Sequence, residues 1–264
     1  MRNNHARPLV VKYGGSALAS EPDPVIAEIA ALHLAGHAIV LVHGGGPEID
    51  RALAERSIAT ERIGGHRVTD AAVLETVEAV LCGTINKRLV RALSTLGVPA
   101  VGVSGEDART LVAEKMLGQH GEDLGFVGEI ADCNVALVHA LLNAHMLPVI
   151  APLAVARDGS HAYNVNADLA AAAIAARLTA SSFVLITNVP RVLRDPDDPQ
   201  SGIDRMTADE ALAFAQSEAC RDSMKPKSLA AAIAVRGGAA AAYVCSAKPD
   251  AVARALAGDA TTIA

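Results

Sequence analysis

Two glycine-rich segments, each following an apolar run, are the part of this sequence best suited to chemistry. They are VVKYGGS at residues 10–16 and VLVHGGGP at residues 40–47. Glycine lets backbone N–H groups approach an anion closely, and the positive end of a helix dipole favours phosphate or carboxylate. Both segments have the pattern of a strand, a tight turn and a helix start. We therefore predict two anionic groups held near each other.

Lys12 lies just before Gly14 and Gly15 in the first segment, where its side chain could reach a phosphate held by the turn. The alternative is a solvated lysine at a strand end. The sequence contains neither the Walker A pattern GxxxxGK[ST] nor the dinucleotide pattern GxGxxG. A phosphate site here must therefore be of another type.

The second segment ends in Pro47, which suits a first helical turn because proline lacks the N–H that would be unpaired there. Glu48 and Asp50 follow, and they could satisfy the helix dipole themselves and compete with an anionic ligand. For this turn alone, the structural and functional interpretations remain equally open.

Arg67 stands in GGHRVTD, residues 64–70, between a glycine pair and the expected N-cap of a helix, either Thr69 or Asp70. A planar guanidinium at this position could hold a carboxylate through two parallel hydrogen bonds.

Asp168 and two lysines occupy the starts of two further predicted helices. In YNVNAD, Asp168 taken alone is explained as a first-turn acid that the helix dipole favours. In DSMKPKSLAAA, by contrast, Lys225 and Lys227 place positive charge where the dipole disfavours it. Local rules broken in this way often mark a functional site.

The elements that position these residues alternate between strand and helix along the chain. Continuous apolar strands such as FVLIT suit a parallel sheet covered by helices on both faces. The predicted fold is a three-layer α/β/α protein with an open, mostly parallel sheet. Its strands lie near 8–13, 38–42, 99–103, 147–151, 182–187 and 240–244, and its helices near 23–35, 47–57, 70–96, 134–145, 167–178, 207–217 and 226–236.

Three segments, 58–68, 105–130 and 153–164, mix glycine, charge and short β-prone runs. They are predicted to form hairpins beyond one edge of the sheet and to line a site. The stretch RDPDDPQSG is predicted as an excursion within a lobe. The lobe junction is placed near 178–182, which gives lobes 1–180 and 181–264.

Composition points to small-molecule partners. The chain has 264 residues, a net charge of −6, three Phe, three Tyr and no Trp, which argues against a nucleic-acid surface. Its four cysteines lack CxxC spacing, and His33 and His37 lack further ligands nearby, so we predict reduced cytosolic thiols and no metal bound by the protein.

No membrane span and no secretory signal are predicted. The first residues, MRNNHARP, are polar and lead directly into a strand. The apolar stretch 135–156 is interrupted by polar residues and proline, so it fits a helix followed by a strand better than a span. The expected location is therefore the cytoplasm.

The motifs, taken in order, resemble the amino acid kinase family. They are VVKYGGS, HGGGPEID, GGHRVTD, GTINKRLV, GFVGEI, YNVNADLAAAAIA, LITNVP and MKPK, and the match spans residues 9–264. The combination of HGGG, RVTD and NxNAD is similar to the branch that acts on N-acetylglutamate. The resemblance implies that the γ-phosphoryl group of ATP is transferred to the side-chain carboxylate of N-acetyl-L-glutamate in arginine biosynthesis.

This reaction needs charge neutralisation and alignment more than acid–base catalysis. A carboxylate of pKa about 4 is already ionised at pH 7, so the nucleophile needs no general base. Lysines and backbone N–H groups should supply most of the stabilisation when two anions are brought together.

The resemblance also implies a role for each matched residue. Lys12 would neutralise the transferring phosphoryl group, Lys227 would act from the nucleotide side, and Asp168 would orient both lysines. Magnesium would be carried mainly by the ATP phosphates. The implied binding residues are Gly14 and Gly15 for phosphate, Gly45 and Gly46 for the reacting end of the substrate, Arg67 for its α-carboxylate, Asn164 for its α-substituent, and Thr187 and Asn188 for the nucleotide, whose base should lie near 187–205.

The sequence departs from the family pattern in three places. DSMKPK has no glycine before Met224, and Lys225 replaces a small or apolar residue. Asn188 and Arg191 stand where Asp and Gly are usual, and arginine would disfavour a positive φ. No long helix precedes the first strand, although such a helix links dimers into a ring in arginine-inhibited relatives. We therefore predict a homodimer insensitive to arginine.

Three alternative functions compete with this interpretation. A kinase of the same family could act on a related acyl amino acid, such as a carrier-linked aminoadipate. A non-catalytic ligand-sensing homologue is disfavoured because Lys12, Asp168 and Lys227 are retained. A dinucleotide oxidoreductase is disfavoured by the missing GxGxxG turn.

Overall fold

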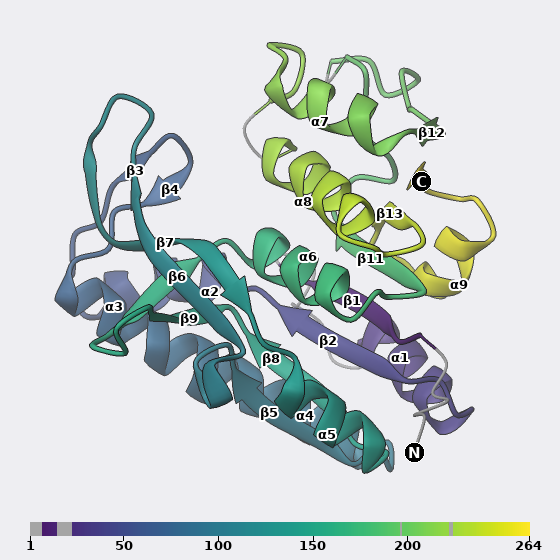
Figure 1. Ribbon diagram of the computed structural model, residues 1–264, viewed down its shortest axis with the longest axis horizontal. Helices are drawn as coiled ribbons and strands as arrows, with labels where there is room; N and C mark the ends of the chain where they lie inside the picture. Colours follow the sequence, from purple (N-terminus) through teal and green to yellow (C-terminus); the bar gives the residue numbers. More distant parts are fainter. Residues whose placement is uncertain (1–6, 15–22, 196, 222–223) are drawn as a thin grey trace.

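The computed structural model covers the chain and describes residues 7–14, 23–195, 197–221 and 224–264. One eight-stranded sheet organises it (Figure 1). The strands, in their order across the sheet, are β12 (Arg205–Met206), β14 (Thr261–Ile263), β13 (Ala242–Ser246), β11 (Ser182–Thr187), β1 (Leu9–Tyr13), β2 (Ile39–His43), β8 (Leu147–Ala151) and β5 (Ala100–Ser104).

The predicted mostly parallel sheet is confirmed. Neighbouring strands run parallel except β13 and β14, which pair antiparallel at the C-terminal end of the chain. Because β1 pairs with both β2 and β11, the sheet is continuous across the junction predicted near residue 180.

Each central strand is buried on both faces, as the uninterrupted apolar runs indicated. In β1, Val11 and Tyr13 join one core cluster while Val10 joins the other. The first core is covered by α1 (Pro24–Leu34), α2 (Gly46–Glu55), α3 (Ala71–Glu78), α4 (Asn86–Thr95) and α9 (Ala251–Leu256). The second is covered by α5 (Ala136–Asn143), α6 (Ala167–Arg177) and α8 (Lys225–Arg236), with α7 (Ala208–Gln216) packed against α8.

A π-helical segment, Ala79–Ile85, joins α3 to α4 without a break. Leu81 and Ile85 of this segment face the second glycine turn, where a side chain at Gly45 would come within 2.2 Å of Ile85 and 2.9 Å of Leu81. A larger residue at position 45 would therefore have to displace the ends of these two buried side chains.

All three predicted hairpin segments are present, and two of them close into a small barrel. β3 (Arg62–Ile63) and β4 (His66–Arg67) form one hairpin. A short 3-10 turn (Asp107–Arg109) leads into the barrel, whose strands run in the order β10 (Ala162–Val165), β7 (Asp123–Cys133), β6 (Leu111–Leu117) and β9 (Leu153–Ala156). The hairpin and the barrel strands lie together at one end of the molecule (Figure 1).

Three elements near the C-terminus, β12, α9 and β14, were not predicted. Each is at most six residues long, too short for the periodicity that reveals a helix or strand. Within the described ranges, none of the helices combines the length and apolar composition needed to cross a bilayer.

Candidate active site

The two glycine turns lie against each other at the carboxyl ends of adjacent parallel strands. Gly44 donates its N–H to the carbonyl of Tyr13 over 3.1 Å. A Cβ on Gly14 would lie 2.7 Å from the Gly44 nitrogen, so a larger residue at position 14 would force the turns apart. Gly15 lies outside the described residues. The predicted closeness of the turns is therefore confirmed.

The second turn opens directly into a helix. Gly45 is the N-cap of α2 and makes no side-chain capping bond, and a Cβ on Gly46 would meet open space. Within the described residues, the helix that follows the first turn is α1, which begins at Pro24, and Asp23 accepts hydrogen bonds from its Val25 and Ile26 N–H groups. Residues 15–22, which follow the first turn, lie outside the described part of the chain, so the helix start expected there stays a prediction.

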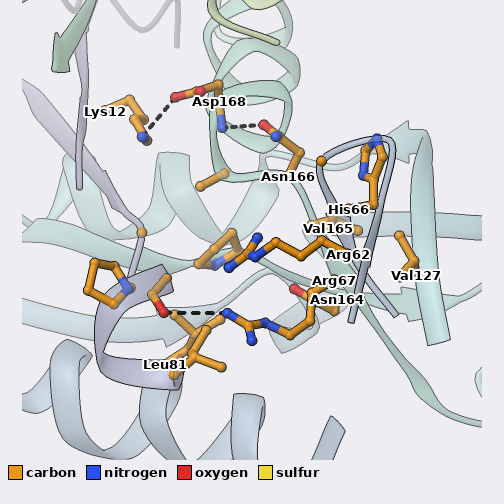
Figure 2. A pocket seen from close by; sticks show the side chains of 18 residues that line it. Lys12, Arg62, His66, Arg67, Leu81, Val127, Asn164, Val165, Asn166 and Asp168 are labelled. Carbon is orange, nitrogen blue, oxygen red and sulfur yellow. Dashed lines mark hydrogen bonds and ion pairs between the residues drawn. The ribbon is translucent and has the colours of Figure 1, made fainter. Parts of the chain in front are cut away.

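A cavity of about 270 Å³ opens beside the second turn. Predicted site residues from four separate segments line it, and Figure 2 shows Lys12 and Asp168 pointing toward each other on one side while Arg62 and Arg67 reach in from the β3–β4 hairpin. The predicted residues that line the cavity are Lys12, Gly45, Gly46, Arg67, Asn164 and Asp168.

Asp168 holds two lysines from opposite sides of the site. Its Oδ1 lies 2.8 Å from Lys12 Nζ and its Oδ2 lies 3.4 Å from Lys227 Nζ. Asn166, not Asp168, caps α6 through the Asp168 and Leu169 N–H groups. The Asp168 carboxylate is therefore not needed as a cap and is free to face the lysines.

These three charges are almost fully withdrawn from water. The exposed fraction of the side chain is 6% for Asp168, 9% for Lys12 and 17% for Lys227. Burial by itself raises the pKa of Asp168, but the positive charges of Lys12 and Lys227 outweigh it and hold that pKa below its usual value. The carboxylate is ionised at neutral pH, and the cluster carries a net charge of +1.

Arg67 is buried at the opposite end of the cavity, with 4% of its side chain exposed. Its Nη2 pairs with Asp50 Oδ1 at 2.6 Å and its Nη1 is buried without a hydrogen-bond partner. Thr69 Oγ1 donates to the Arg67 carbonyl and accepts from Asn164 Nδ2, which links the β4 strand to β10. An unpartnered buried guanidinium nitrogen is a favourable position for an anionic oxygen.

The segment after Arg67 is fixed by a close backbone approach to the barrel. Gly125 has φ +69°, and a Cβ there would lie 2.2 Å from the Thr69 carbonyl. Of the two candidate N-caps, Asp70 is the one that caps α3, through a 2.8 Å bond from Val73 N–H.

Sequence reasoning missed Arg62, which lines the same cavity. The two-residue Gly64–Gly65 turn places Arg62 directly opposite Arg67 in the hairpin register. A glycine pair flanked symmetrically by arginines was the signal available in the sequence.

Thr187 and Asn188, predicted to bind the nucleotide, lie at the carboxyl end of the strand next to β1, outside the cavity. Thr187 ends β11, the strand beside β1, and donates through Oγ1 to Asn188 Oδ1 at 3.2 Å. The described residues that line the cavity do not include Thr187, Asn188 or Lys227. Lys227 is connected to the cavity through its ion pair with Asp168.

Two of the family departures have a visible outcome. Arg191 is not among the residues with positive φ, and its guanidinium pairs with Asp204 and, at 3.8 Å, with Asp259. Lys225 is the first residue of α8. Asp222 and Ser223 lie outside the described part of the chain.

His43 holds the second glycine turn in place through a hydrogen bond to Gly44. It is fully buried, its Nδ1 donates to the Gly44 carbonyl at 3.1 Å, and its Nε2 accepts from Asn86 Nδ2 at 3.3 Å. Asn86 also donates to the Val149 carbonyl at 2.9 Å, which ties the turn to β8. Burial lowers the pKa of His43 to about 4, although the bond to Gly44 opposes the shift.

The low pKa of His43 predicts a pH-dependent stability. Because an unfolded histidine has a pKa of about 6.5, the unfolded chain binds more protons between pH 4 and 6.5, and the free energy of unfolding decreases by up to about 1.4 kcal/mol for each unit by which the pH is lowered. Urea unfolding from pH 7 to 4.5 should show a shallower decline for His43→Asn than for wild type. His37→Asn, at an exposed position, should keep the wild-type slope; equal slopes for all three proteins would contradict the assignment.

Comparison with known proteins places the chain in a defined group. Residues 7–246 match the model of the amino acid kinase family. An acetylglutamate kinase of Brevibacillus brevis is 41% identical over 238 residues, covering 90% of this chain and 88% of that protein. One of Petrotoga mobilis is 43% identical over 223 residues, covering 83% and 73%.

Solved structures share the fold. The N-acetylglutamate synthase of Neisseria gonorrhoeae, complexed with coenzyme A and N-acetyl-glutamate, matches with TM-score 0.82 and 25% identity over 98% of this chain and 59% of that longer one. The carbamate kinase of Giardia lamblia bound to AMP-PNP matches with TM-score 0.71 and 16% identity over 98% of both chains, a likeness of fold alone.

Proposed function

The chain belongs to the amino acid kinase family, as its motifs predicted, and from this premise we propose that it is an acetylglutamate kinase. It transfers the γ-phosphoryl group of ATP to the side-chain carboxylate of N-acetyl-L-glutamate and forms N-acetyl-L-glutamyl 5-phosphate, a step of arginine biosynthesis. Relatives of this name that are about 40% identical over most of both chains support the substrate assignment.

The observation that carries the proposal is the buried Lys12–Asp168–Lys227 cluster beside an uncapped helix start. The reaction brings a carboxylate and a polyphosphate together, so their repulsion must be offset. A net positive cluster that is shielded from water interacts strongly with such anions. The free N–H groups of α2 add further donors at the same place.

In the proposed mechanism, a carboxylate oxygen of the substrate attacks the γ-phosphorus, and the bond from that phosphorus to the β–γ bridging oxygen breaks. ADP leaves with the bonding electron pair, and no proton is transferred. Lys12 neutralises the transferring group, Lys227 acts on the nucleotide phosphates, and Asp168 holds both ammonium groups in position.

The amino-acid substrate is proposed to occupy the cavity beside α2. Backbone N–H groups at Gly45 and Gly46 receive the reacting carboxylate, Arg67 binds the α-carboxylate and Asn164 contacts the α-substituent. The buried, unpartnered Arg67 Nη1 supports this orientation, because a carboxylate there would supply its missing partner.

ATP is proposed to lie toward residues 181–264, an ATP-binding lobe, while residues 1–180 form the amino-acid-binding lobe. Gly14 and Gly15 would contact its phosphates, and Thr187 and Asn188 lie at the end of the strand beside β1, on the nucleotide side. Magnesium bound to those phosphates would supply additional positive charge. We also place the enzyme in the cytoplasm, where ATP is available.

A homodimer is part of the proposal. Strand β5 forms one edge of the sheet, and four of its five residues are only half-buried. A sheet edge with partly exposed side chains is suited to pairing with a second copy.

The test is an acyl-phosphate trap. Purified protein incubated with ATP, magnesium, N-acetyl-L-glutamate and hydroxylamine should form a hydroxamate, and Lys227→Ala should reduce its rate by at least about a hundredfold. A wild-type rate no higher than that of Lys227→Ala would overturn the proposed function.

A further inference from the structure

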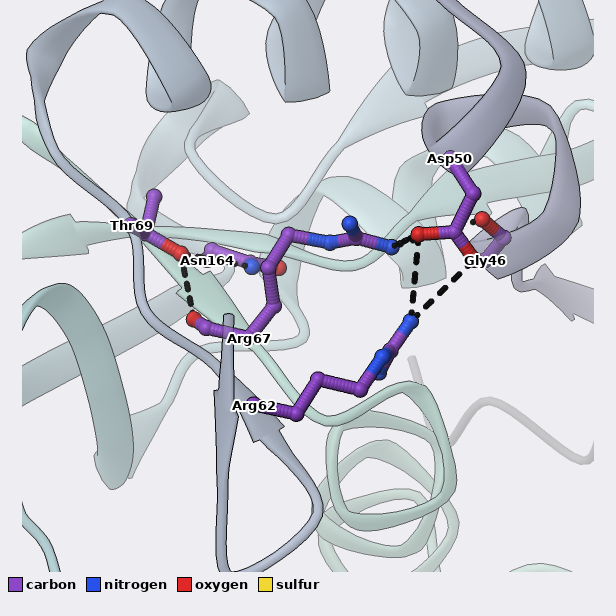
Figure 3. A network of polar contacts seen from close by, with 6 residues as sticks. All are labelled: Gly46, Asp50, Arg62, Arg67, Thr69 and Asn164. Carbon is purple, nitrogen blue, oxygen red and sulfur yellow. Dashed lines mark hydrogen bonds and ion pairs between the residues drawn. The ribbon is translucent and has the colours of Figure 1, made fainter. Parts of the chain in front are cut away.

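Asp50 places a second carboxylate at the position proposed for the substrate's α-carboxylate. Figure 3 shows it between the guanidinium groups of Arg67 and Arg62. Asp50 Oδ1 lies 2.6 Å from Arg67 Nη2, and Asp50 Oδ2 lies 3.3 Å from Arg62 Nη2. The Asp50 carboxylate is therefore paired with one terminal nitrogen of the arginine that is proposed to bind the substrate.

The three side chains differ in their freedom to move. Arg67 is buried, with 4% of its side chain exposed, and it is held between the Gly46 carbonyl and Asp50. Asp50 and Arg62 are 50% and 48% exposed. Asp50 can therefore leave Arg67 at little cost, whereas the Arg67 guanidinium cannot easily follow it.

Asp50 pairs with only one of the two terminal nitrogens of Arg67. One terminal nitrogen pairs with the aspartate, and the other is buried with no partner. A bidentate grip on an incoming carboxylate needs two parallel N–H groups. The grip is complete only when Asp50 moves away from Nη2.

Arg62 provides the place to which Asp50 moves. It lies opposite Arg67 in the β3–β4 register and already contacts both carboxylate oxygens of Asp50, at 3.4 and 3.3 Å. Resting on the proposed function, we propose that Asp50 and Arg62 set substrate affinity by carboxylate exchange. Asp50 pairs with Arg67 in the empty site and with Arg62 alone when the substrate carboxylate binds Arg67. Asp50 and Arg62 are thus positioning residues that act through Arg67.

The first test measures dissociation constants by calorimetry and KM in the hydroxamate assay. Asp50→Asn removes the competing charge and should tighten N-acetyl-L-glutamate binding about fivefold, the size of one partly exposed ion pair. Asp50→Ser, whose side chain is too short to reach either arginine, should tighten binding by the same factor as Asp50→Asn. Arg62→Gln should weaken binding about threefold, because Asp50 then stays on Arg67. None of these changes should alter kcat by more than about twofold, since none reaches the phosphoryl group.

Two further measurements separate carboxylate exchange from a merely structural role. The α-amide of N-acetyl-L-glutamate lacks the α-carboxylate, so its affinity should not increase in Asp50→Asn. In the double variant, Arg62→Gln should have no further effect, because its partner is already gone. Glu114→Gln, which breaks the exposed Arg157–Glu114 pair on the barrel, is the matched control and should change nothing.

Several results would overturn the exchange. They are weaker binding by Asp50→Asn, an equal gain for the α-amide, or an Arg62→Gln effect that persists without Asp50. Absence of N-acetyl-L-glutamate binding to wild type and Asp50→Asn alike would also do so. Binding with the expected pattern but no hydroxamate would instead overturn the proposed phosphoryl transfer and leave the exchange supported.

Discussion

Replacing Lys12 with alanine is expected to lower kcat about a thousandfold while KM for N-acetyl-L-glutamate changes less than about threefold. Lys12 lies at the carboxyl end of β1, 2.8 Å from Asp168 and beside both glycine turns. There its charge opposes the repulsion between the two reacting anions, which is greatest in the transition state. Initial rates of hydroxamate formation at varied substrate concentrations would measure both constants.

A matched control is Lys115→Ala, which removes an exposed lysine paired with Asp123 on the barrel. Its kcat and KM should equal those of wild type. If Lys12→Ala raised KM strongly and left kcat unchanged, Lys12 would be a ground-state binding residue, and its proposed role in the transition state would be wrong.

Replacing Asp168 with asparagine should affect both catalysis and stability. The amide keeps the shape of the carboxylate but leaves two ammonium groups in a site where the lysine side chains are 9% and 17% exposed. Breaking a buried ion pair on one side costs about 3 kcal/mol, and we expect a loss of this size in the free energy of unfolding together with a fall in kcat of at least about a hundredfold. Urea unfolding and the hydroxamate assay measure the two effects.

The stability difference between wild type and Asp168→Asn should depend on pH in a defined direction. Lys12 and Lys227 hold the pKa of Asp168 below its ordinary value, even though burial raises it. Its contribution is therefore complete above the unfolded pKa of about 4 and is lost as the pH falls through the folded pKa. Wild type and variant should differ by a constant amount from pH 8 to 6 and converge below about pH 4.

Asp123→Asn breaks an exposed pair with Lys115 and serves as the control. Its cost should be small, as is usual for surface pairs. If Asp168→Asn were as stable as this control, the buried cluster would not have the electrostatic role assigned to it.

Much of the fold could be predicted from local patterns. The apolar strands FVLIT and AIVLV have no polar face, so their residue types alone imply burial on both sides. The Gly64–Gly65 turn likewise marked a hairpin. The closure of β6, β7, β9 and β10 into a barrel was not predictable in this way, because pairing between strands separated along the chain leaves little local signal.

The candidate site, too, was predictable in part from local patterns and in part only from the tertiary structure. Neighbouring glycines pointed to Lys12 and Arg67, and the helix dipole marked Lys227 as a charge out of place, whereas Asp168 taken alone was explained as a first-turn acid. The structure brings Lys12, Asp168 and Lys227 into contact. Asp50 was visible only as an acid that could compete with a ligand. Its contact with Arg67 across 2.6 Å depends on where α2 meets the β3–β4 hairpin.

By itself, the sequence determined the layered α/β/α architecture, the two glycine turns and membership of the amino acid kinase family, since these depend on residue type and spacing along the chain. The tertiary structure decided which charges meet. It placed Asp168 between two lysines that lie far from each other in the sequence, and it put Asp50 on the arginine proposed for the substrate. Ion pairs act over a few ångströms in space, and that separation is set by strand register and helix packing, which no local pattern records.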